Sequence, residues 1–187
     1  MSGVRWLTCE EQAAWRAYQL AAQLLEEVLE RQLQREAGMA HADYAALATL
    51  AEAPGGRLRM RELAAALRYS PSRTSHAVAR LEARGRARRR ACPDDGRGQL
   101  AVLTEAGSAA LAAAAPGHVA EVRRRVFDRL SPEQVAQLRA IAETVGSGID
   151  GRPVRGSGQR LRSGPCYTPA PGTAGIGEPP GRIDAVP

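Results

Sequence analysis

Arginine, serine and histidine side chains are concentrated between residues 70 and 97. The first part of this stretch, SPSRTSHAVARLEA, carries them at spacings that place many on one side of a helix. Guanidinium groups bind phosphate and the edge of guanine, and hydroxyl and imidazole groups exchange hydrogen bonds with base edges. This chemistry is recognition of a polyanion, and it predicts a nucleic-acid surface.

The charge distribution supports a polyanion partner. The 187-residue chain has a net charge of +6, and all 26 of its basic residues are arginine. Residues 55–97 alone carry +8, whereas residues 1–54 carry −4 and residues 98–148 are neutral overall. A basic block beside acidic or neutral neighbours marks a polyanion site more often than a solvated surface.

Nothing in the sequence indicates catalysis or metal binding. We find no Gly-rich phosphate loop and no recognisable set of nucleophile, base and acid. His41, His76 and His118 lie far apart without ligand spacing. We therefore expect a protein that is not an enzyme, with no catalytic residue, no metal and no cofactor.

Cysteine usage and hydropathy predict a cytoplasmic protein. Cys9, Cys92 and Cys166 are odd in number and widely separated, and no secretory signal precedes them, so a disulfide framework is not expected. No apolar run approaches the length of a membrane-spanning helix, and no membrane partner is expected.

Apolar periodicity predicts a mainly α-helical chain. Residues 8–37 form a long amphipathic helix that starts with a capping box at Thr8 and ends at Gly38. Shorter helices are expected at about 43–53 and 60–67. Ser70-Pro71 and Gly85 then bound a fourteen-residue helix.

This fourteen-residue helix has two different sides. A period of 3.6 residues places Thr74, Ala77, Val78 and Leu81 on the buried side. The outward side is small, polar and basic, and it carries Ser72, Arg73, Ser75, His76, Ala79, Arg80 and Ala83.

After Gly85 the period changes to two, which predicts a β-hairpin. The segments ARRRA and QLAVL form its strands, and CPDDGRG forms the turn. Of the three arginines at 88–90, at most two can share a face, and the third is expected to be solvated or paired with an acidic side chain.

The rest of the chain is predicted to be two helices and a tail. Thr104 starts a helix that we expect to kink or break at Pro116-Gly117, and Ser131 starts the last helix with a second capping box. The arginines at 123–125 are interpreted as a solvated helix face. Gly, Pro, Ser and Arg dominate residues 149–187, which we predict to be a disordered tail.

The order of short helix, turn, basic helix and hairpin is that of a winged helix-turn-helix. In this arrangement a helix enters the major groove, and the hairpin, or wing, reaches the adjacent backbone or minor groove. The residues predicted to form the DNA-binding surface are Ser70, Ser72, Arg73, Ser75, His76, Arg80, Arg88, Arg90, Asp95 and Arg97.

Two segments resemble the MarR family of bacterial transcriptional regulators. They are LRMRELAAALRYSPSRTSHAVARLEARG and CPDDGRGQLAVLTEAG. The wing of that family typically reads Asp-x-Arg and, after a few residues, Leu-Thr-x-x-Gly, which correspond here to Asp95, Arg97 and residues 103–107. The order of helices also matches over about residues 7–148, and the tail is not covered.

The resemblance implies a homodimer on double-stranded DNA. Helices at about 8–37 and 105–148 would form a helical dimerisation layer, and residues of about 43–104 would form the winged domain. The two recognition helices would meet successive major grooves of a pseudo-palindromic operator. Asp95 would pair with an arginine and steady the wing tip, while Arg97 would enter the minor groove. Apolar surface in excess of one small core, on the first helix and over residues 119–145, also favours a dimer.

The resemblance also implies a small-molecule effector, such as a phenolic or aromatic anion. A pocket between the dimerisation layer and the winged domain could be lined by Trp15, Tyr18, His41 and Tyr44. The alternative is that these four are ordinary core residues.

Our leading hypothesis is a homodimeric, sequence-specific transcriptional repressor. One alternative is an architectural protein that coats DNA with little sequence preference, although such a protein needs only charge and not a hydroxyl-bearing and imidazole-bearing helix face. A second alternative is a redox-responsive regulator that uses Cys9. The helix N-terminus would favour its thiolate, whereas Glu10 and Glu11 would oppose it.

Overall fold

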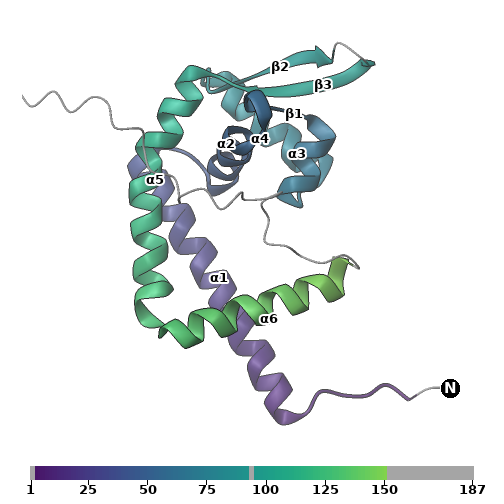
Figure 1. Ribbon diagram of the computed structural model, residues 1–187, viewed down its shortest axis with the longest axis vertical. Coiled ribbons are helices and arrows are strands. Elements are labelled where there is room, and N and C mark those ends of the chain that lie inside the picture. Colours follow the sequence, from purple (N-terminus) through teal and green to yellow (C-terminus); the bar gives the residue numbers. More distant parts are fainter. Residues whose placement is uncertain (1–2, 93–94, 151–187) are drawn as a thin grey trace, which may run out of the picture.

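The structure is a computed structural model that describes residues 3–92 and 95–150 (Figure 1). The tail predicted from residue 149 therefore lies outside the described residues from 151 onward. The elements in chain order are α1 (Cys9–Ala37), α2 (His41–Glu52), the 3-10 turn η1 (Pro54–Gly56), β1 (Arg57–Arg59), α3 (Met60–Leu67), α4 (Pro71–Ala83), β2 (Ala87–Cys92), β3 (Asp95–Leu103), α5 (Glu105–Arg125), the 3-10 turn η2 (Phe127–Arg129) and α6 (Pro132–Asp150).

Helix α1 begins and ends where its capping residues predict. The Thr8 hydroxyl accepts a hydrogen bond from the Glu11 amide at 3.1 Å, and the Thr8 amide donates to the Glu11 carboxylate at 2.7 Å. Gly38 ends the helix in the left-handed conformation with φ of 58°. Only the C-terminal part of α1 has buried side chains, because only that part packs on the winged domain.

Helices α2, α3 and α4 form the helix-turn-helix core together with the end of α1. Leu33, Leu47 and Leu81 are fully buried in one cluster, and Leu63 and Val78 lie in a second cluster that reaches the sheet. The predicted inward side of α4 is confirmed, because Thr74, Ala77, Val78 and Leu81 are all buried. The helix has 13 residues, one fewer than predicted.

The wing is a three-stranded antiparallel sheet with the order β1-β3-β2. The hairpin of β2 and β3 is the predicted one, and β1 is an addition that the sequence did not predict. Its three residues, Arg-Leu-Arg, are too few to give a periodic signal. The strand exists because Leu58 pairs with Ala101 of β3 and packs against the cluster that contains Leu63. The predicted fold class, mainly α-helical with a small wing, is confirmed.

The sequence predicted a kink or a break at Pro116-Gly117, and the break is absent, because α5 runs as one helix from Glu105 to Arg125. Pro116 removes one amide donor, and the carbonyl that loses it belongs to Ala112, on the exposed side of the helix, where water can bind it. Gly117 lets α5 approach α1 closely, since a Cβ at this position would lie 2.3 Å from the Glu36 carboxylate.

Large apolar side chains remain exposed away from the winged domain. Figure 1 shows α6 at the end of the molecule opposite the wing, where it overlaps α1 in this view. Ser131 caps α6 through the predicted second capping box. The exposed side chains on these elements are Trp15, Tyr18, Leu20 and Leu24 of α1, Val119 of α5, and Leu138, Ile141, Val145 and Ile149 of α6.

Candidate nucleic-acid interface

The exposed face of α4 forms the centre of the candidate site. The Ser70 hydroxyl caps the helix by accepting a hydrogen bond from the Arg73 amide at 3.2 Å, and Pro71 occupies the first turn. Ser72, Ser75 and His76 are exposed along the next turns. The sequence therefore builds a helix N-terminus that presents hydroxyl, imidazole and guanidinium groups to solvent, as readout of base edges requires.

Arg73 is held at this N-terminus by Tyr69. Its guanidinium carbon lies 3.9 Å from the centre of the Tyr69 ring, within the range of a cation-π interaction. Stacking occupies the face of the guanidinium and leaves its N–H edge able to donate hydrogen bonds to a phosphate or a base. Arg73 is thus partly ordered before any partner binds.

Arg80 lies on the predicted outward side but is paired within the protein. Its guanidinium donates to both Asp43 oxygens, with Nη2 2.5 Å from Oδ1 and Nε 3.2 Å from Oδ2. The Asp43 side chain is only 3% exposed, whereas that of Arg80 is 48% exposed. The hydrogen bond to Asp43 raises the pKa of Arg80. Arg80 therefore positions α4 against α2 through Asp43, and its predicted contact with DNA stays a prediction.

The three arginines of β2 alternate across the sheet, as predicted. Arg88 and Arg90 are exposed, and Arg89 turns to the opposite side. The Arg89 guanidinium lies 3.4 Å from the Glu82 carboxylate and donates to the Ser75 carbonyl at 2.8 Å. Of the two alternatives predicted for the third arginine, solvated or paired with an acidic side chain, the structure shows the pair, and Arg89 fixes β2 beside α4.

Asp95 and Arg97 belong to β3, but their side chains lie outside what the structure describes. Their predicted roles at the wing tip stay predictions. Sequence reasoning missed Asp43 and Glu82, which hold Arg80 and Arg89. It also missed Arg57 and Arg59 of β1. The only signal in the sequence for these two residues was the excess of arginine over residues 55–97.

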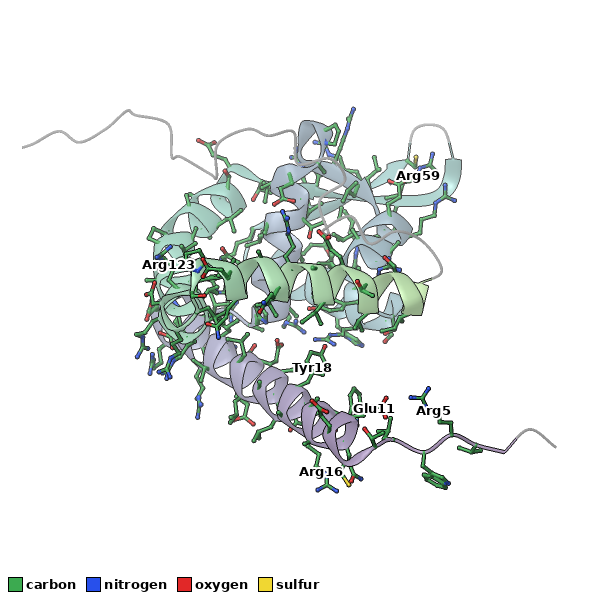
Figure 2. The ribbon with its side chains drawn as sticks, turned by 60° about the horizontal axis from the view of Figure 1, so that its bottom comes forward. Arg5, Glu11, Arg16, Tyr18, Arg59 and Arg123 are labelled. Atoms are coloured by element: carbon green, nitrogen blue, oxygen red, sulfur yellow. The ribbon has the colours of Figure 1, made fainter. Side chains whose placement is uncertain are left out.

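The predicted pocket residues form two separate pairs. Trp15 and Tyr18 stack on α1 with ring centres 6.1 Å apart, and Figure 2 shows Tyr18 on the part of α1 that extends away from the winged domain. Trp15 also lines an open hollow of about 480 Å³ together with Trp6 and Arg16. His41 and Tyr44 instead lie against His118 of α5, with ring centres 5.7 Å and 4.4 Å from it.

The second pair belongs to a polar junction between α1, α2 and α5. The His41 amide donates to the Glu30 carboxylate at 2.7 Å, and the His41 Nδ1 lies 3.1 Å from a Glu26 oxygen. The Nδ1 atom of His118 is buried and has no hydrogen-bond partner among the described residues. Burial and the neighbouring His41 lower the pKa of His118.

This environment predicts a loss of stability in acid that depends on His118. The folded protein keeps the imidazole neutral, whereas the unfolded chain takes up a proton at the ordinary histidine pKa of 6.5. The free energy of unfolding therefore has its full His118 contribution above pH 6.5, and this contribution decreases as the pH falls below that value. We expect urea-unfolding midpoints at about pH 7.5 and about pH 5.5 to differ less for His118→Gln than for the wild type. An unchanged difference would assign the acid sensitivity to other groups.

Over residues 3–92 and 95–150, no group of three or more His, Cys, Asp or Glu side chains is placed to hold a metal ion. No helix in the same part of the chain is long and apolar enough to cross a membrane. Cys9 is exposed at the first turn of α1, and Cys92 is buried in β2.

Known proteins share this arrangement. The sequence model of the MarR family matches residues 37–98. Sco3205 of Streptomyces coelicolor, a MarR family transcriptional regulator crystallised in complex with DNA, is 54% identical, with 80% of this chain and 94% of that chain covered and a TM-score of 0.77. AbsC, a MarR family transcriptional regulator of the same organism, is 41% identical, with 80% of this chain and 100% of that chain covered and a TM-score of 0.74. A comparison with curated proteins found no match.

The short helix α3, the turn, the basic helix α4 and the three-stranded wing define a winged helix-turn-helix protein. Its likeness to Sco3205 and AbsC extends over most of both chains, well beyond the winged domain. The chain belongs to the MarR family of transcriptional regulators, as the resemblance predicted.

Proposed function

We propose that the protein is a homodimeric, sequence-specific repressor that binds a pseudo-palindromic operator in double-stranded DNA in the cytoplasm. One observation carries the proposal. The N-terminal turns of α4 expose Ser72, Arg73 and His76, and the neighbouring strand exposes Arg88 and Arg90. Arg89 holds β2 against α4, so groups suited to base edges and groups suited to phosphate come from neighbouring elements. The 54% identical regulator Sco3205 was crystallised with DNA, which supports the same partner for this chain.

Exposed apolar side chains support the dimer. Trp15 and Tyr18 are 51% and 64% exposed, and Ile141 and Val145 of α6 are 62% and 51% exposed. Water-exposed apolar surface of this extent is typical of a face that a partner covers. A second copy of the chain related by a two-fold axis would cover it with the same residues and present two α4 helices to successive major grooves.

The proposal competes with an architectural protein that coats DNA. Selection from a pool of random duplexes at near-physiological salt separates the two functions. We expect recovery of a two-fold-related motif with half-sites about one helical turn apart. Retention of duplexes without any motif would favour the architectural protein, and no retention would refute DNA binding. A promoter bearing the recovered motif should then be less active when the protein is present.

Arg97 provides a test of the wing. The sequence pattern assigns its guanidinium to the minor groove, where the negative potential of DNA is concentrated. Arg97→Ala should weaken operator binding about tenfold or more in a titration against labelled duplex. Its molar mass from light scattering should remain that of the wild-type dimer. If the variant loses the dimer, the wing is misassigned.

A small aromatic effector and a redox response stay predictions. Because Trp15 and Tyr18 lie apart from the His118 junction, any pocket that uses all four aromatic residues would have to form in the dimer. Exposed Cys9 is accessible to peroxide. Operator binding measured with and without a phenolic acid, and for Cys9→Ser with and without peroxide, tests each response separately.

A further inference from the structure

The outer face of the wing sheet carries four arginines in two rows. Val102 of β3 pairs with Arg57 of β1 on one side and with Arg88 of β2 on the other. Leu100 pairs in the same way with Arg59 and Arg90. Because directly paired residues of antiparallel strands point to the same face, each row places two guanidinium stems on either side of an aliphatic residue.

This face is turned away from the helices. The opposite face contains Leu58 and Ala101, which pack in the core, and Arg89, which binds Glu82 and Ser75 of α4. Arg57, Arg88 and Arg90 are exposed, and their guanidinium groups have no ion pair or hydrogen bond with the described residues. Arg59 is partly buried, and its amide is used to cap α3 through Glu62.

Arg57, Arg88 and Arg90 meet no acidic side chain among the described residues of this face. Among the outer-face positions whose side chains the structure describes, none is acidic. Like charges gathered on a small surface repel one another, and the repulsion is relieved by a polyanion. Within each row, the arginine of β1 and the arginine of β2 are two strand spacings apart, about 10 Å. This distance is roughly the axial rise of three phosphates along one DNA strand.

We propose that this face, centred on Arg57 and Arg88, is a second phosphate-binding surface that holds the DNA backbone outside the half-site read by α4. The inference rests on the proposed DNA-binding function. Strand β2 lies beside α4, and β1 is the far edge of the sheet. A duplex seated on α4 thus meets Arg88 and Arg90 first, and it reaches Arg57 only where it continues beyond β2 and β3 to the far edge of the sheet. The contact lengthens the bound segment without reading its sequence.

The test compares two duplexes that carry the selected operator, one without flanks and one with about ten extra base pairs on each side, one further helical turn. The variant is Arg57→Gln in the full chain. Arg123→Gln is the matched control, since it removes the same charge from α5, on the other side of the molecule from Arg59 in Figure 2. Binding constants are measured for each protein over a range of salt concentrations, and folding is checked by urea unfolding.

Arg57→Gln should weaken binding to the flanked duplex about tenfold and reduce the magnitude of the salt slope by about two, one phosphate contact per subunit. Binding to the unflanked duplex and the behaviour of Arg123→Gln should match the wild type. Hydroxyl-radical footprints should show flank protection by the wild type that Arg57→Gln lacks.

Other outcomes would overturn the inference. Equal losses of affinity for the flanked duplex in both variants would indicate a bulk charge effect. No loss of affinity for Arg57→Gln would show that the face does not touch DNA. In either case wild-type binding to the unflanked operator would leave the proposed function intact. Failure of the wild type to bind either duplex would refute both.

Discussion

Gly107→Ala is expected to destabilise the protein by about 3 kcal/mol or more. A Cβ at this position would lie 1.9 Å from the Arg86 carbonyl oxygen and 2.9 Å from the Leu103 Cδ1. The first contact is with backbone, which cannot rotate away as a side chain can. Helix α5 would therefore have to move away from the loop that follows α4.

That movement would break a compact set of hydrogen bonds. The Thr104 amide donates to the Arg86 carbonyl at 3.2 Å, and the Thr104 hydroxyl donates to the Gly85 carbonyl at 2.7 Å. The same hydroxyl accepts from the Gly107 amide at 3.0 Å and so caps α5. These bonds attach the first helix after the wing to the end of α4, which explains the threonine and glycine of the Leu-Thr-x-x-Gly pattern.

Urea unfolding at one fixed protein concentration measures the effect. Gly148→Ala is the matched control, because Gly148 is also in a helix and nothing lies within 4 Å of its added Cβ. Alanine is the better helix former, so this variant should equal or exceed the wild type in stability, by up to about 1 kcal/mol. If both variants unfold at the wild-type midpoint, the close approach of α5 to Arg86 is absent.

Arg80→Ala is expected to cost about 2–3 kcal/mol of stability, because it leaves the Asp43 carboxylate buried without its cation. Half of the Arg80 side chain is exposed, so water replaces part of the lost interaction and the cost stays below that of breaking a fully buried pair. Operator binding should also weaken, because α4 loses its attachment to α2.

Arg73→Ala is the comparison within the same helix. Arg73 stacks on Tyr69 and has no buried carboxylate to leave unpaired, so its loss should cost at most about 1 kcal/mol of stability. The double variant Arg80→Ala/Asp43→Ala should be more stable than the sum of its two single effects predicts. An additive cycle would show that the Arg80–Asp43 pair does not hold α4.

Helix limits could be predicted from the sequence because the capping interactions span only a few residues. Thr8, Ser70, Thr104 and Ser131 each accept a hydrogen bond from the amide three positions later, so residue type and spacing suffice to locate four helix starts. The buried side of α4 follows equally from local periodicity. These local rules also place Ser72, Arg73 and His76 on an exposed surface.

The helix does not break at Pro116-Gly117, the second of the two outcomes that the sequence predicted there, because the rule that proline ends a helix is local and takes no account of tertiary packing. Proline disrupts an isolated helix, but here packing between α1 and α5, with Gly117 at the point of close approach, holds the backbone helical. The freed carbonyl faces solvent, so the remaining cost is small.

The sequence by itself determined the elements, their caps and the basic outward face of α4, since each depends on interactions within about four residues. Tertiary structure alone decided which arginines face outward and which are paired. Arg80 reaches Asp43 across 37 positions, and Arg57 shares a row with Arg88 only through Val102. A charged side chain has the same identity in the sequence whether its partner is a carboxylate or a phosphate. Its role is fixed only when the chain folds and sets the distance to the opposite charge.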